Sequence, residues 1–324
     1  MSIPMGMSTT AHGRYTIRLY RKGLGLVKEL EFDNIITDAG LDHLGVRPFS
    51  LVSTNGIVYW MHLGTGTSTP SATDTALAAP VANGVKRGGS GVTITQNWNR
   101  TTFFGEDPPR VRIVRTYTGT YTAGAVVGNL SEVGVGPGTT STPDSLFSRA
   151  LILDSLGNPT TVTATADDTV VVVYTLTLDF TGKTSGSITV GGISYDYATD
   201  LSGETSHAPG NLYQINQWAN TVGQGASCYL TSMSPWADPT TSYSWVAGAD
   251  TVAYTAYTNG SHYRDATCTF GTGLGSPGIQ GVRLHMGGND SYEGQAWRIR
   301  FSSPIPFTNV QQFRVAVRTS WARA

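Results

Sequence analysis

The side chains most able to do chemistry in this sequence are its six histidines, its two cysteines and a few paired acidic residues. The histidines are His12, His43, His62, His207, His262 and His285. None stands at a metal-ligand spacing from another histidine or from a cysteine pair, so we expect ordinary strand or surface histidines and no metal. Cys228 and Cys268 could pair with each other. Two cysteines make no disulfide framework, however, and we expect two buried thiols.

The acidic pairs stand in stretches that are typical of turns. They are Glu106-Asp107, Asp167-Asp168 and Asn289-Asp290, and exposure to water in a turn is the expected role of each. Glycan cleavage needs two carboxylates about 5–10 Å apart across a groove, and calcium binding needs a recognisable ligand loop. The sequence shows neither, and it has no G-x-S-x-G motif for a nucleophilic serine. We therefore expect no enzyme, no catalytic residue and no cofactor.

The sharpest candidate for a binding surface is the aromatic-rich stretch from Tyr229 to Phe270. Alternation along strands places several of these rings in a core. Trp236, Tyr243 and Trp245 remain as candidate contacts, because Trp and Tyr provide a large contact area at a low entropic cost. A partner protein is the favoured target, and a glycan is the alternative.

Composition limits the class of protein. Only 13% of the residues are charged, against about 25% in typical soluble domains. The net charge of −1 favours neither nucleic acid nor an anionic membrane. No apolar run approaches the ~18 residues of a membrane-spanning helix, so no membrane insertion is expected. The first residues do not resemble a signal peptide, which predicts synthesis in a cytoplasm without general secretion.

The periodicity of the sequence predicts strands nearly throughout. Residues 15–32 form a hairpin, a short helix lies within 34–45, and strands follow at 57–63, 92–104 and 111–117. The stretch 129–178 contains three apolar runs separated by turns, and the last of these, 170–178, is a central strand.

A weaker copy of that stretch follows after an offset of 149 residues. Gly124 aligns with Gly273, Val133 with Val282, Gly138 with Gly287 and Arg149 with Arg298. A new hairpin crosses Gly191-Gly192, and residues 209–222 have helical spacing. We predict an all-β protein with two antiparallel, jelly-roll-like β-sandwich domains, residues 1–180 and 181–324, that meet near 180–186 and contain one or two short helices.

Several short motifs in residues 15–180 carry a family resemblance. They are NIITDAGL at 34–41, LGTG at 63–66, TP at 69–70, DTAL at 74–77, EVG at 132–134, LFSRAL at 146–151 and GNPTTV at 157–162. In this order they resemble virion proteins of tailed bacteriophages of the tail fibre, tail tip or minor tail type. Residues 181–324 carry no comparable motif.

The resemblance implies a non-enzymatic, β-rich component of the virion, mounted on the tail as a fibre, tip, baseplate or collar protein. We expect residues 1–180 to attach to the tail and residues 181–324 to face an interaction partner or a receptor. The expected partners are other copies of the chain, with a trimer favoured, and other tail proteins. Alternatives are a host receptor module that binds a surface glycan, a capsid decoration protein and, as the least favoured, a depolymerase. The expected location is the virion tail, after synthesis in the bacterial host cytoplasm.

Overall fold

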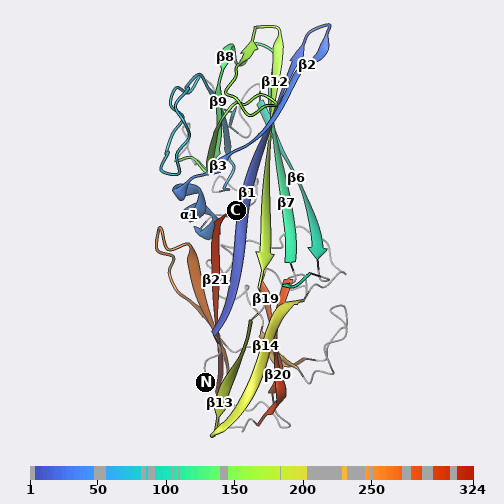
Figure 1. The fold of residues 1–324 in the computed structure, drawn as a ribbon, viewed down its shortest axis with the longest axis vertical. Helices are drawn as coiled ribbons and strands as arrows, with labels where there is room; N and C mark the ends of the chain where they lie inside the picture. Colours follow the sequence, from blue (N-terminus) through green and yellow to red (C-terminus); the bar gives the residue numbers. More distant parts are fainter. Residues whose placement is uncertain are drawn as a thin grey trace. The chain divides into compact units, whose positions relative to one another are not determined.

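The computed structural model describes residues 4–46, 56–81, 85–86, 92–103, 106–108, 110–138, 145–182, 184–202, 228–231, 245–248, 251–271, 279–286, 295–306 and 312–324 (Figure 1). Strands dominate these residues, and the helix α1 (Asp38–Val46) is the one α-helix among them. The predicted all-β class is confirmed. The two jelly-roll sandwiches stay a prediction, and the second predicted helix, at 209–222, lies outside the described residues.

The described residues in the first half of the chain form twelve strands besides α1. They are β1 (Pro4–Arg21), β2 (Gly25–Asp33), β3 (Ile35–Ile36), β4 (Trp60–Gly64), β5 (Val85–Lys86), β6 (Val92–Phe103), β7 (Arg110–Tyr121), β8 (Gly128–Leu130), β9 (Glu132–Gly136), β10 (Ser148–Leu151), β11 (Val162–Ala164) and β12 (Asp168–Thr181). The predicted hairpin at 15–32 is confirmed, since β1 and β2 pair antiparallel across a turn with Gly23 and Gly25 at φ of 81° and 75°. Glycine adopts these positive φ values without steric cost.

Nine strands follow among the described residues of the second half. They are β13 (Thr184–Val190), β14 (Ile193–Ser202), β15 (Cys228–Thr231), β16 (Trp245–Gly248), β17 (Thr251–Tyr254), β18 (Tyr263–Phe270), β19 (Ile279–Met286), β20 (Gln295–Ile305) and β21 (Phe313–Arg323). The predicted hairpin across Gly191-Gly192 is confirmed as β13 and β14, which pair antiparallel from Thr184 opposite Thr199 to Val190 opposite Ile193.

The helix α1 lies at the place of the predicted short helix at 34–45 and extends one residue beyond it. The Thr37 Oγ1 accepts a hydrogen bond of 2.9 Å from the Gly40 N–H, which caps one of the free donors of the first turn. Asp38 places a carboxylate at the positive end of the helix dipole. Leu41 and Leu44 are buried, so the helix covers part of the core with one face.

The strands form three larger sheets and one small one. The eight-stranded sheet has the order β17-β18-β21-β1-β12-β7-β6, with β2 pairing with β1 outside this path. A five-stranded sheet has the order β3-β10-β9-β4-β5, and a six-stranded sheet has the order β13-β14-β20-β19-β15-β16. The small sheet consists of β11 and β8.

Strand pairing supports the predicted internal repeat. The order β3-β10-β9-β4-β5 recurs as β14-β20-β19-β15-β16. Arg149 pairs with Gly134 in the first copy, and Arg298 pairs with Arg283 in the second, which preserves the register after a shift of 149 residues. In the eight-stranded sheet, β12-β7-β6 follow β1 on one side and β21-β18-β17 follow it on the other. The two copies therefore share one topology.

By their contacts, the described strands fall into two compact units, each made of several segments. One unit is Met1–Thr9, Thr101–Arg112 and Asp179–Trp321, and the other is Thr10–Arg100, Ile113–Leu178 and Ala322–Ala324. The eight-stranded sheet takes strands from both halves of the chain. The predicted division into residues 1–180 and 181–324 stays a prediction, because contacts alone do not decide whether either segment folds by itself.

The core of the unit built on Thr10–Arg100 lies between two layers. On β12, Val170, Val172, Tyr174, Leu176 and Leu178 are fully buried and alternate with partly exposed residues. The Tyr121 hydroxyl donates to the Met61 carbonyl of β4 at 2.9 Å, so this face of the eight-stranded sheet covers the five-stranded sheet. Each fully buried large apolar side chain contributes about 1.5–3 kcal/mol.

Two kinds of feature are absent from the described residues. Among them, no helix has the length and apolar character needed to cross a membrane. The same part of the chain contains no cluster of three or more His, Cys, Asp or Glu side chains that could hold a metal ion.

Candidate functional site

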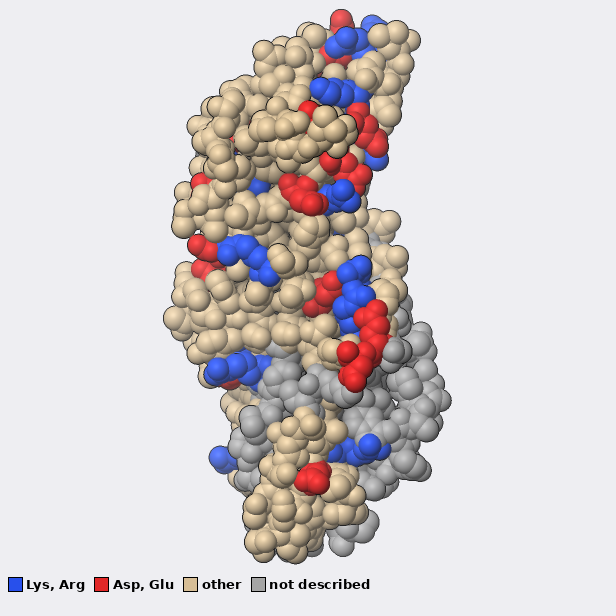
Figure 2. Space-filling model, viewed as in Figure 1, with Lys and Arg blue, Asp and Glu red and all other residues tan. Residues whose placement is uncertain are grey.

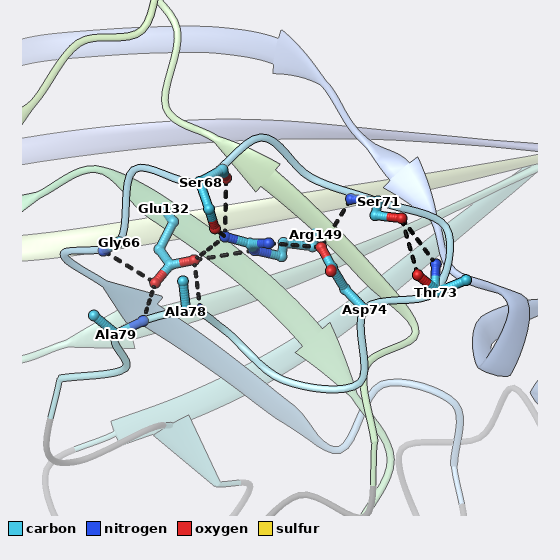
Figure 3. A network of polar contacts seen from close by, with 9 residues as sticks. All are labelled: Gly66, Ser68, Ser71, Thr73, Asp74, Ala78, Ala79, Glu132 and Arg149. Atoms are coloured by element: carbon cyan, nitrogen blue, oxygen red, sulfur yellow. Dashed lines mark hydrogen bonds and ion pairs between the residues drawn. The ribbon is translucent and has the colours of Figure 1, made fainter.

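A buried ion pair lies at the centre of the five-stranded sheet. Glu132 begins β9 and Arg149 lies on the neighbouring strand β10 (Figure 3). The Arg149 Nε and Nη2 both donate to Glu132 Oε2, at 3.0 and 2.8 Å. Glu132 has no exposed surface, and Arg149 is 2% exposed. Such a pair is stable in a core only when the remaining polar atoms of both side chains find partners.

Backbone amides complete the hydrogen bonding of Glu132. Its Oε1 accepts from the Gly66 N–H at 3.1 Å and from the Ala79 N–H at 2.7 Å, and its Oε2 accepts from the Ala78 N–H at 3.1 Å. With the two bonds from Arg149, the carboxylate accepts five hydrogen bonds. No lone pair is left for a substrate or a proton.

Arg149 extends the network into the loop that follows β4. Its Nη1 donates to Asp74 Oδ2 at 2.6 Å, and its Nη2 donates to the Ser68 carbonyl at 3.1 Å and hydroxyl at 2.9 Å. Asp74 also accepts from the Ser71 N–H at 2.8 Å. Partial burial acts to raise the pKa of Asp74, but the bonds from Ser71 and Arg149 outweigh it and keep that pKa below its usual value.

The loop at 65–80 is held against the sheet by these contacts, which we call the Glu132 network. Further bonds run from the Thr65 N–H to the Ala79 carbonyl at 2.8 Å and from the Ser131 hydroxyl to the Gly66 carbonyl at 2.8 Å. A Cβ at Gly64 would lie 2.5 Å from Glu132 Oε1, so glycine is required there for close approach. The network therefore fixes the shape of a surface loop from inside the protein.

Five of the motifs that carry the family resemblance meet at or beside this network. LGTG supplies Gly66, DTAL supplies Asp74, EVG supplies Glu132 and LFSRAL supplies Arg149. NIITDAGL joins the last of these, because the Thr37 N–H donates to the Phe147 carbonyl at 3.0 Å. Motifs that are scattered over more than a hundred residues thus specify one packing arrangement.

The Glu132 network is built for structure and not for catalysis. A general acid or base must reach a substrate proton directly or through one water. Glu132 is sealed from solvent, its lone pairs are occupied, and its charge is offset by Arg149. The arrangement can hold a loop, and the sealed carboxylate of Glu132 cannot reach a substrate proton.

His62 lies on β4, beside the network. It is 9% exposed, and burial lowers its pKa to about 4. Its Nε2 has no hydrogen-bond partner among the described residues, and its ring lies 5.6 Å from that of Trp60. His62 is therefore neutral at pH 7, which fits the predicted role of an ordinary strand histidine.

The structure says little about the predicted aromatic contacts. Trp236 and Tyr243 lie outside the described residues. Trp245 begins β16, where its backbone pairs with Thr231, and its side chain is outside the described part of the chain. The predicted contact set therefore stays a prediction.

Cys268 is a buried free thiol, while the side chain of Cys228 is not among those described.

One acidic pair differs from its predicted role in a solvated turn. Asp168 is 1% exposed and accepts from the Arg21 Nε at 2.8 Å and from the Thr165 N–H at 2.8 Å. The bond from Arg21 holds the pKa of Asp168 well below its usual range. The turn at 165–168 folds back on this carboxylate, so it acts as an internal acceptor. Glu106 does stay exposed, beside Arg110 at 3.1 Å, and Asn289-Asp290 lies outside the described residues.

The sequence analysis did not identify the ion pair of Glu132 and Arg149. The available signal was a single charge inside each of two otherwise small or apolar motifs, EVG and LFSRAL. A charge in a buried strand almost always has a partner.

Together, the fold and this site define an all-β protein with a duplicated sheet and a buried structural ion network. No protein-family model, curated protein or solved structure matches this chain.

Proposed function

We propose that this chain is a non-enzymatic structural component of a bacteriophage virion that is associated with the tail, as a fibre, tip, baseplate or collar protein. The observation that carries the proposal is the meeting of the tail-protein-like motifs in the Glu132 network. There they hold a loop against a sheet and leave no reactive group. Motifs with this role belong to a scaffold.

The distribution of charge also supports a scaffold. Figure 2 shows basic and acidic residues side by side in small groups, with wide areas between them that carry no charged residue. Ion pairs among the described residues join Arg14 to Glu31 at 2.9 Å and Arg112 to Asp179 at 2.7 Å. A surface with few unpaired charges loses little hydration free energy when another protein covers it. This favours assembly with copies of the chain and with other tail proteins.

The position of the protein in the particle tests this proposal. Purified virions of the phage that encodes the chain would be analysed by mass spectrometry and by electron microscopy with an antibody against it. We expect several copies per particle, labelled at the tail. Absence from purified particles, or labelling of the capsid alone, would refute the proposal.

Activity provides an independent check. The purified full-length protein would be incubated with capsule, peptidoglycan and lipopolysaccharide, and reducing ends would be measured. We expect no release above that of boiled protein. Release that is abolished by replacing one carboxylate would show an enzyme.

A further inference from the structure

Over β7 and β12, the face of the eight-stranded sheet that turns away from the core carries almost no charge. In the unit built on Thr10–Arg100, the outward positions are alternate residues from 114 to 120 on β7 and from 169 to 177 on β12. All nine are partly exposed, and every one is Thr or Val. On β6 the exposed residues Thr95 and Asn99 continue the same face. We call these positions the threonine face.

Charged residues border the threonine face and are paired within the chain. Along β1 and β2, the Arg18 Nε lies 2.5 Å from Glu29 Oε2. Further along β7 and β12, the Arg112 Nη2 lies 2.7 Å from Asp179 Oδ2. A charge-free centre with charged groups at its edge has the anatomy of a protein interface.

The second copy of the sheet shows that the topology does not require this composition. Asp265 on β18 is opposite Arg318 on β21, and the two form an ion pair of 2.7 Å. A shift of 149 residues aligns Asp265 with Thr116. The same shift aligns Arg318 with Thr169. The first copy thus has two threonines where the second has a surface ion pair.

The chemistry of the threonine face is complementary to itself. A threonine hydroxyl can donate or accept, so an identical face can satisfy its hydrogen bonds, and the methyl groups can pack against one another. Its nine central positions contain no aromatic ring of the kind that stacks on sugars. Three strands about 4.8 Å apart, with nine residues of about 3.4 Å each, give the face an area of roughly 440 Å². This is about half of the ~800 Å² that each partner buries in a standard specific interface, which is the size of a weak contact.

We propose that copies of this chain bind one another through the threonine face, so that identical faces meet at the symmetry axis of the assembly. This proposal rests on the structural role proposed above and adds the surface that is used. The occupant is a second copy because the neutrality and the hydroxyl chemistry of the face match it to itself.

Sedimentation of the full-length chain tests the proposal. Wild type, Thr118→Arg in the centre of the face, and Thr95→Arg on its exposed strand β6 would be compared from about 1 to 200 µM, a range that spans micromolar dissociation constants. The control is Thr189→Arg, at an exposed position of β13. We expect an oligomer for the wild type and the control, and at least about tenfold weaker association for both face variants, because like charges would meet.

Circular dichroism would confirm that each variant is folded, and Thr95→Arg decides the question if Thr118→Arg does not fold. A wild type that remains monomeric throughout, or an oligomer that folded face variants leave intact, would overturn the proposal. Such a result would not affect the virion proposal, which is judged by the presence of the protein in particles.

Discussion

The two copies of the five-stranded arrangement share their strand order and register, but they differ in what they bury. In the first copy, Glu132 stands on β9 and Arg149 on β10, and both are sealed from solvent. In the second, the residue 149 positions after Glu132 is Gly281, while Arg298 keeps the position of Arg149. Identical pairing without the acid shows that the register does not depend on the ion pair.

The difference shows that the residues that determine strand pairing are distinct from those that shape the loop after β4. Backbone hydrogen bonds and the alternation of apolar residues determine which strands pair. The Glu132 network is added to this frame, and its partners Gly66, Asp74, Ala78 and Ala79 all belong to the loop after β4. Its role is therefore to shape that loop and not to build the sheet.

Removal of the Glu132 charge is expected to have the largest effect. Glu132→Gln would turn an amide group towards the backbone N–H donors and leave Arg149 without its buried counter-charge. We expect the free energy of unfolding to fall by about 3–5 kcal/mol. Urea unfolding at pH 7 would measure it. The matched control is Glu29→Gln, whose exposed pair with Arg18 is worth at most about 1 kcal/mol. Equal losses in both variants would contradict a special role for the network.

His62 should make the first copy sensitive to acid. Its folded pKa of about 4 lies below the usual value of about 6.5. The unfolded chain therefore binds the proton more readily, and stability falls as the pH drops from 6.5 to 4, by about 3 kcal/mol. His62→Phe should remove this part of the pH dependence in urea unfolding at pH 7, 5.5 and 4. An unchanged slope would show that the ring is not buried in its neutral form.

Asp74, at the outer end of the network, should contribute less. Asp74→Asn keeps an acceptor for Ser71 but removes the charge that faces Arg149, so we expect a loss of about 1–2 kcal/mol at pH 7. Because the folded pKa of Asp74 is depressed, its contribution is present above its unfolded pKa and is lost as the pH falls through the folded value. The gap between variant and wild type should therefore close below about pH 3.8. A gap that persists there would point to altered packing.

The smallest effect is expected for the surface pair of the second copy. Asp265 and Arg318 are 33% and 54% exposed at their side chains. A double-mutant cycle with Asp265→Asn and Arg318→Gln should give a coupling energy of about 0.2–1 kcal/mol. The cycle would be measured at low and at high salt, and the coupling should shrink with salt. A coupling above about 2 kcal/mol would remove the contrast with the buried pair.

Local features of the fold could be predicted from the sequence. The hairpins and α1 were located because Gly23, Gly191 and Thr37 act within a few residues of themselves. The repeat was visible as a few identities at one offset, and the register then supported it. The placement of both β12 and β21 beside β1 was not predicted, because a pairing between distant strands leaves no local pattern.

The candidate site was less predictable for the same reason. In the sequence, Glu132, Arg149 and Asp74 stand out only as parts of motifs, because no spacing rule links residues that meet through a folded loop. The burial of Asp168 was missed because a turn sequence indicates exposure, whereas Arg21 reaches this carboxylate from a hairpin far away in the sequence. The residue types indicate which side chains can form ion pairs, but tertiary packing determines which residues become their partners.

The position of β1 between β12 and β21 also sets an order of events during synthesis. The partner strand β21 leaves the ribosome about 300 residues after β1, which takes roughly 15–60 s at 5–20 residues per second. Over that interval β12 can already pair with β1, while the side of β1 that will receive β21 stays an open template. The eight-stranded sheet can therefore be completed only after nearly the whole chain has been made. Nascent chains on the same messenger RNA must therefore be kept from pairing with one another through this unpaired edge of β1.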